Sequence, residues 1–294
     1  MDSPRAGNLA APMTRRTTAR TREMSTRSGR GMASTPGPER YHASPWRRKG
    51  APRIWAHRGA SADAPENTVE AFAEAERQGA EGIECDVRLC RSGELVVFHD
   101  EDLRRLCGIP VAVRELPLAE LRTLKVKGGP GRSATGRIPT LDEAVRSVGT
   151  SMLWNVELKV DRHEEAEPLA KALVHWARRS GMGERLLVSS FHPLAILTCR
   201  KLAPELATAY LWEPDSYAAI WHYFWAGVGA SAAVHPGVRD VTEEAVERWH
   251  RRGFVVNAWV ANDPAEIRRL SEAGVDGIIT DVPARARQVL YGDS

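Results

Sequence analysis

From residue 53 onward, short apolar runs alternate with longer amphipathic stretches along the chain. The apolar runs have the length and β-branched content of strands, at residues 53–57, 82–86, 152–159, 186–190, 206–212, 231–235, 254–260 and 277–280. Between and after them, helical spacing predicts helices at residues 68–78, 140–148, 164–180, 193–202, 215–225, 242–252, 264–273 and 283–290. Proline begins three of these helices and glycine follows four of them, as the geometry of helix ends favours.

Eight strand–helix units of this length predict an α/β fold of the (β/α)8 TIM-barrel class. The alternative is a doubly wound open sheet, which is disfavoured because no G-x-G-x-x-G motif follows the first strand. In a barrel, functional side chains gather where the strands end, so the carboxyl ends of the predicted strands are the place to look for chemistry.

The first 50 residues differ from the rest in composition. They hold eleven basic residues against three acidic ones and almost no large aliphatic residues, which predicts a disordered basic tail over residues 1–50. Residues 51–294 form the predicted barrel domain and carry a net negative charge. The basic tail has no interleaved aromatic residues and the domain that follows it is acidic, and both features argue against a nucleic-acid partner.

Other classes of protein are excluded by what the sequence lacks. No apolar run of about 18 residues is present, so no transmembrane segment is expected. No apolar stretch of signal-peptide length follows Arg15 and Arg16, and a cytoplasmic location is therefore predicted. The four cysteines form no C-x-x-C pair, which predicts free thiols and disfavours a zinc site.

Acidic residues stand at the ends of two predicted strands. Glu84 and Asp86 alternate along the second strand and so point to the same side, as do Glu157 and Lys159 on the third. Three carboxylates directed into one barrel mouth are costly unless a cation binds them. A set of oxygen ligands suits a hard divalent cation, Mg²⁺ or Ca²⁺.

Two histidines are predicted beside these carboxylates. His57 and Arg58 end the first strand, whereas His99 follows a predicted hairpin at the barrel mouth that turns at Ser92-Gly93. Antiparallel pairing of residue 86 with 97 and of 84 with 99 would bring His99 to the level of Glu84. Histidines suit proton transfer at a phosphoryl or acyl centre, and Arg58 and Lys159 can neutralise phosphate charge.

These residues, in order and spacing, closely resemble the motifs of the glycerophosphodiester phosphodiesterase family. The resemblance covers residues 53–290 and rests on His57-Arg58-Gly59, Ala64-Pro65-Glu66-Asn67-Thr68, Glu84-x-Asp86-Val87, Val97-Phe98-His99-Asp100, Glu157-Leu158-Lys159, Ser189-Ser190-Phe191, Asn257-x-Trp259 and Gly277-Ile278-Ile279-Thr280-Asp281. It implies a metal-dependent hydrolase that cleaves glycerophosphodiesters to glycerol 3-phosphate and an alcohol.

The resemblance also implies a role for each site residue. Glu84, Asp86 and Glu157 are the implied metal ligands, His57 and His99 the general acid and base, and Arg58 and Lys159 the phosphate-binding residues. The chain departs from the family pattern at Arg105-Leu106-Cys107, where an Arg-Thr-Thr-like run is usual, and at Cys90-Arg91 in the hairpin turn. Neither departure falls on an implied ligand, so they affect the shape of the rim and substrate choice.

The substrate's alcohol is left open by the sequence. Phe191 and Trp259 stand at strand ends, where they either contact the substrate or belong to the core. The aromatic-rich segment 210–225 is interpreted as a core-packing helix, and a lipid-contacting patch is the alternative. That alternative would favour a lysophospholipase D acting on lysophospholipids, and a further alternative is an inactive barrel that serves as a binding protein.

Overall fold

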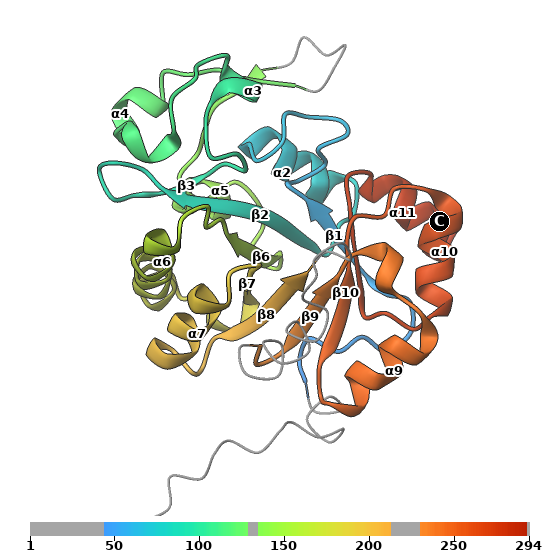
Figure 1. Ribbon diagram of the computed structural model, residues 1–294. Helices are drawn as coiled ribbons and strands as arrows, with labels where there is room; N and C mark the ends of the chain where they lie inside the picture. Colours follow the sequence, from blue (N-terminus) through green and yellow to red (C-terminus); the bar gives the residue numbers. More distant parts are fainter. Residues whose placement is uncertain (1–43, 129–134, 213–229, 293–294) are drawn as a thin grey trace, which may run out of the picture. The chain divides into compact units, whose positions relative to one another are not determined.

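The computed structural model describes residues 44–128, 135–212 and 230–292. Its barrel strands are β1 (Arg53–His57), β2 (Gly82–Leu89), β6 (Leu153–Leu158), β7 (Leu186–Ser190), β8 (Ala207–Trp212), β9 (Ala233–Pro236), β10 (Val255–Ala258) and β11 (Gly277–Thr280). Each strand pairs in parallel with its neighbours, and β1 pairs with both β2 and β11, which closes the ring (Figure 1). The predicted (β/α)8 barrel is therefore confirmed.

Helices cover the outside of the strands. They are α2 (Val69–Arg77), α5 (Leu141–Arg146), α6 (Ala166–Ser180), α7 (Pro193–Leu202), α9 (Glu243–Arg251), α10 (Pro264–Glu272) and α11 (Pro283–Tyr291), with short 3₁₀ turns η2 (His163–Glu165), η3 (Gly183–Arg185) and η4 (Val238–Asp240). Their ends follow sequence signals: Thr140 and Glu143 form a reciprocal capping box at α5, and Gly181 ends α6 in the left-handed conformation. The helix predicted at residues 215–225 lies outside the described residues.

The lower half of the barrel interior is filled by apolar side chains. This cluster consists of Trp46, Trp55, Leu187, Ala209, Ala233, Val255 and Ile279. Trp46 is 5% exposed and stacks on Trp55, with 6.2 Å between the ring centroids. The composition of the first 50 residues placed Trp46 in the basic tail. The structure instead makes residues 44–50 part of the barrel domain, because burying the indole stabilises this segment against the strands.

The upper half of the interior is polar. Besides the acidic residues described below, it contains Asn155, Ser189, His235 and Asn257, all at most 1% exposed. The Nε2 atom of His235 lies 3.0 Å from the Asn257 amide nitrogen, so it accepts a hydrogen bond there as a neutral imidazole. Burial lowers the pKa of His235 to about 3.

This buried histidine should make the protein less stable in mild acid. His235 has a folded pKa of about 3, below its unfolded value of about 6.5, so the unfolded chain takes up the proton first. Stability is therefore highest above pH 6.5 and falls as the pH drops toward 3. Urea unfolding should show wild type losing about 2 kcal/mol more than His235→Gln between pH 7.5 and 5. Equal losses in the two proteins would contradict this assignment.

A hairpin and a small insert follow β2. The antiparallel strand β3 (Leu95–Val97) pairs with the end of β2, and a short region follows it, with α3 (Arg104–Cys107), η1 (Val113–Glu115), α4 (Leu118–Leu121), β4 (Val126–Lys127) and β5 (Thr135–Gly136). The insert has its own apolar core, which includes Phe98, Leu103 and Leu106. In the view of Figure 1 the insert, with α3 and α4, lies above β2 and β3. The sequence predicted the hairpin and missed the insert, whose elements are too short for a clear periodicity.

The register predicted for this hairpin is wrong by one residue. Val97 pairs with Val87 rather than with Asp86, and the Phe98 N–H donates to the Asp86 carbonyl at 2.9 Å. The cause is a three-residue turn, closed by the Cys90 N–H donating to the Glu94 carbonyl at 3.1 Å. His99 then leaves the pairing beyond Phe98 and reaches the barrel mouth from the hairpin's end.

Candidate active site

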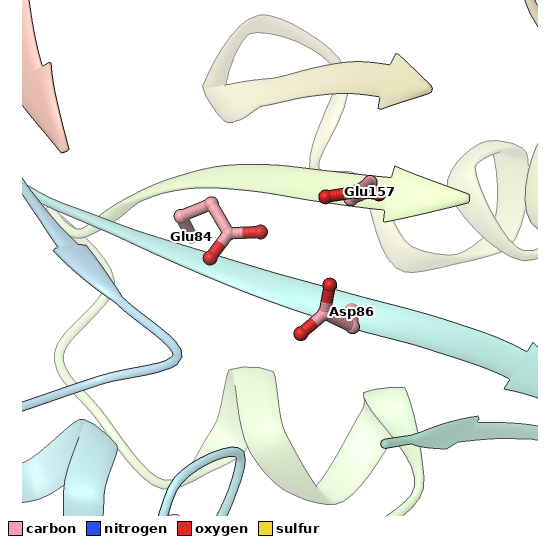
Figure 2. Close-up of side chains that lie close together, drawn as sticks. All are labelled: Glu84, Asp86 and Glu157. Atoms are coloured by element: carbon pink, nitrogen blue, oxygen red, sulfur yellow. The ribbon is translucent and has the colours of Figure 1, made fainter. Parts of the chain in front are cut away.

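Three carboxylates converge inside the barrel mouth. Glu84 and Asp86 come from β2 and Glu157 from β6, where it is aligned with Asp86 in the strand register. One oxygen of each lies within 4.8 Å of the others, and the residues are 4%, 1% and 6% exposed. Figure 2 shows the three side chains gathered between the two strands. The pattern of alternating acidic residues thus gives the cluster that the sequence predicted.

The electrostatics of this cluster favour a bound cation. Burial and the two neighbouring carboxylates raise the pKa of Glu84 well above its ordinary range. Burial would also raise the pKa of Asp86, but the charges of Lys159 and Arg58 outweigh it and hold that pKa low. Within the described part of the chain, the buried side-chain nitrogen and oxygen of Asn155, aligned with Glu84, have no hydrogen-bond partner. An all-oxygen, carboxylate-rich set with spare polar atoms fits Mg²⁺ or Ca²⁺.

The two cationic side chains predicted to bind phosphate lie directly against the carboxylates. Lys159 Nζ is 2.8 Å from Glu157 Oε1 and 3.6 Å from Asp86 Oδ1. Arg58 Nε is 3.2 Å from Asp86 Oδ2, and its Nη1 donates to Glu66 Oε1 at 2.9 Å. Both cations are therefore held at the edge of the triad, where their charge suits a phosphate group.

The backbone conformation of the loop after β1 helps to orient Arg58 and the carboxylates of β2. Arg58 has a φ of +57° and Asn67 a φ of +58°, a conformation that costs free energy for residues other than glycine. The Arg58 N–H donates to the Glu84 side chain at 3.1 Å, and the Asn67 amide donates to Asp86 at 2.8 Å. Gly59 is required next to them, because a Cβ there would lie 2.6 Å from the Ala71 carbonyl carbon in α2.

His57 is held by an aspartate from the far end of the sequence. Its Nδ1 lies 2.7 Å from Asp281 Oδ1, just after β11, and its Nε2 lies 3.9 Å from Glu84 Oε2. Ser61 and Asn262 each donate to Asp281, at 2.9 and 2.6 Å. Burial raises the pKa of Asp281, but these hydrogen bonds and the imidazole lower it to about 2. A charged Asp281 fixes the proton on Nδ1, so that Nε2 faces the carboxylates.

His99 is held in the same way. Its Nδ1 lies 2.7 Å from Asp100 Oδ1, and the buried Arg88 donates two hydrogen bonds to its carbonyl oxygen, at 3.0 and 2.6 Å. Arg88 is itself paired with Asp161 beyond β6. Both histidines therefore have Nδ1 engaged by a carboxylate and keep Nε2 for other partners.

The two aromatic residues named from the sequence meet at the rim. Phe191 and Trp259 contact edge to face, with 5.4 Å between ring centroids, and Lys159 Nζ lies 5.8 Å from the Phe191 ring centre. Phe191 is 37% exposed, so it is not a core residue. Trp259 is partly buried, packs on the interior cluster and donates to the His235 carbonyl at 2.9 Å. Of the aromatic residues in segment 210–225, only Tyr210 and Trp212 are described, and both are buried in β8.

Comparison with known proteins agrees with this geometry. Residues 57–285 match the model of the glycerophosphoryl diester phosphodiesterase family. The chain belongs to this family. A glycerophosphodiester phosphodiesterase from Caldanaerobacter subterraneus is 35% identical over 235 residues, which cover 78% of this chain and 94% of the relative. One from Bacillus altitudinis is 33% identical over 253 residues, covering 81% and 97%.

Solved structures of glycerophosphodiester phosphodiesterases share the fold. One from Thermotoga maritima has a TM-score of 0.65 and 30% identity, and the match covers 81% of this chain and 97% of that one. A phosphodiesterase from Oleispira antarctica, solved with the product sn-glycerol-3-phosphate, has a TM-score of 0.70 and 28% identity, with 81% and 96% covered. The prediction that this chain is a phosphoric diester hydrolase is confirmed. No helix among the described residues is both long and apolar enough to span a membrane.

Several residues of this glycerophosphoryl diester phosphodiesterase site were given no role from the sequence. These are Glu66, Asn67, Asp100, Arg105, Asn262 and Asp281, which hold the predicted side chains either directly or through one another. Glu66, Asn67, Asp100 and Asp281 stand inside motifs that carried the resemblance, so adjacency to a named residue was an available signal. Asn262 had none, because it precedes its partner Asp281 by 19 positions.

Proposed function

We propose that this chain hydrolyses glycerophosphodiesters to sn-glycerol 3-phosphate and an alcohol, with Glu84, Asp86 and Glu157 as ligands of a divalent cation and His57 and His99 as acid–base catalysts. One observation carries the proposal. At the barrel mouth, where the buried triad lies, each of two histidines contacts a carboxylate through its Nδ1 atom. The relatives named for this activity and the solved product complex support the choice of substrate.

The phosphodiester is held by charge. Arg58 and Lys159 face the triad from two sides and bind the phosphoryl oxygens. A divalent cation held by the triad supplies further positive charge, which stabilises the oxygens of the transition state. Phe191 and Trp259 stand at the rim, where their faces contact the glycerol or the departing alcohol.

The histidines move the protons. One accepts, on Nε2, the proton that the attacking water loses as the new P–O bond forms. The other donates its Nε2 proton to the leaving oxygen as the bond between phosphorus and the alcohol oxygen breaks, so the proton count balances. Asp281 and Asp100 stabilise whichever imidazole is charged, because each accepts a hydrogen bond from the Nδ1–H.

Release of glycerol 3-phosphate from glycerophosphocholine tests the proposal directly. The 294-residue chain should release it with Mg²⁺ or Ca²⁺, and EDTA should stop the reaction until excess metal is returned. Lysophosphatidylcholine, added as competitor, should not displace the substrate. Turnover of lysophosphatidylcholine alone would keep the chemistry and overturn the substrate, whereas no turnover of any phosphodiester with any divalent cation would overturn the function.

A further inference from the structure

Arg105, in the insert beyond β3, faces the active site. Arg105 lies in the short helix α3, between Leu103 and Leu106, which are buried in the insert core. Gly108, with a φ of +76°, ends the helix. Because those two leucines anchor the helix, Arg105 points away from the insert core and toward the mouth of the barrel. The adjacent Arg104 is 71% exposed and pairs only loosely with Asp102, at 3.8 Å.

Arg105 uses two edges of its guanidinium group on two different carboxylates. Nη1 and Nη2 donate to the two oxygens of Glu66, at 2.7 and 2.8 Å. Nε and Nη2 donate to the two oxygens of Asp100, at 2.7 and 2.9 Å. Two bidentate contacts fix both the distance and the angle between the carboxylates, which the single point charge of a lysine cannot do.

Each of these carboxylates holds one functional group. Glu66 accepts a hydrogen bond from Arg58 at 2.9 Å, and Asp100 lies 2.7 Å from His99 Nδ1. Arg58 belongs to the end of β1 and His99 to the end of the hairpin, so Arg105 connects two parts of the site that lie on separate segments. The chain of contacts runs from Arg58 through Glu66, Arg105 and Asp100 to His99.

We propose that Arg105 is a positioning residue that sets the phosphate-binding Arg58 and the acid–base His99 in register. The inference rests on the proposed function and assigns a role to the insert, whose core holds α3 so that one side chain can join the two halves of the mouth. Leu106 and Cys107, which replace the usual threonines, pack on the apolar core of the insert. The departure from the family pattern thus affects the support of Arg105 and leaves its contacts intact.

Charge balance explains why a cation is needed at this point. Burial would raise the pKa of Glu66, but hydrogen bonds from Arg105 and the charge of Arg58 hold it below its ordinary value. For Asp100, burial is likewise outweighed by the hydrogen bonds from His99 and Arg105, so its pKa is also lowered. Without Arg105 the two carboxylates would repel each other, and the side chains they hold would shift.

Replacement of Arg105 should therefore reduce turnover much more than stability. A displacement of about 1 Å in a catalytic group can cost about 10²-fold in rate. We expect kcat of Arg105→Ala to fall by about that factor and Arg105→Lys to recover little of it. The melting temperature should change only slightly, since Arg105 is 48% exposed and exposed ion pairs contribute little to stability. Arg104→Ala, on the same helix, is the matched control and should behave as wild type.

Chemical rescue separates positioning from a general loss of structure. Guanidinium at millimolar concentration should restore part of the kcat of Arg105→Ala, and potassium chloride at the same ionic strength should not. Wild-type kcat in Arg105→Lys, or no rescue of a folded Arg105→Ala, would overturn the inference. Should the wild type prove inactive on every phosphodiester, the proposed function fails separately. Crystal structures then decide the positioning: unchanged contacts of Glu66 with Arg58 and of Asp100 with His99 in Arg105→Ala would overturn it.

Discussion

In metal-free buffer, Glu84→Gln should be at least as stable as wild type, whereas in excess Mg²⁺ or Ca²⁺ its diesterase turnover should be lower than that of wild type by about 10²-fold or more. The reason is that Glu84 is 4% exposed and faces two other carboxylates, so its charge costs free energy when no cation is bound. Glutamine has the same shape, can still accept the Arg58 N–H through its amide oxygen, and removes the repulsion.

The experiment that checks this compares melting temperatures in EDTA and in excess Mg²⁺ or Ca²⁺. Wild type should gain stability when the cation binds the native state, because the unfolded chain has no assembled site. Glu84→Gln should gain little. Glu167→Gln removes an exposed carboxylate on α6, paired with Lys171, and should keep both the metal response and the activity of wild type. An undiminished metal response in Glu84→Gln would mean that the cation binds elsewhere.

The barrel could be predicted because its strands and helices each carry a local signal. Buried parallel strands are apolar runs, and helices such as α6 show one apolar stripe, so each element can be predicted from its own sequence. The polar triad was predictable for the same reason, since alternation along β2 and β6 places Glu84, Asp86 and Glu157 on one face. Local periodicity was therefore enough for both the architecture and the position of the three carboxylates.

The features that could not be predicted depend on contacts between distant segments. Asp281 contacts His57 although 224 positions separate them in the sequence. Trp46 is buried only because it packs on the apolar cluster inside the barrel. The hairpin register shifted by one residue because turn closure between Cys90 and Glu94 decides it, and no pattern of apolar residues does. The contacts of Arg105 likewise follow only from the insert core that orients α3.

The strained residues show the same dependence on tertiary structure. Arg58 adopts a positive φ value that its local sequence does not favour, and Asn67 adopts one at the smaller cost that asparagine has in this conformation. Side chains from β2 compensate, since Glu84 accepts the Arg58 N–H and Asp86 accepts the Asn67 amide. The strand that carries two of the carboxylates therefore also shapes the loop that carries Arg58, so changes in either should disturb both.

His57→Ala and His99→Ala should each lower kcat by about 10²–10⁴-fold on glycerophosphocholine, as expected for loss of a general acid or base. Each imidazole is oriented by a carboxylate, Asp281 or Asp100, and alanine removes the Nε2 atom that this contact positions. The double variant should lose far less than the product of the two effects, because the residues act in one concerted step.

The leaving group can then assign the two roles. In a p-nitrophenyl ester of glycerol phosphate, the leaving group is p-nitrophenolate, which departs without protonation. The variant that lacks the general acid should therefore recover most of its rate on this substrate. The variant that lacks the base should stay impaired on both substrates. His175→Ala, at an exposed position on α6, is the control and should retain wild-type rates. Near-normal turnover of glycerophosphocholine by either His57→Ala or His99→Ala would remove that histidine from the mechanism.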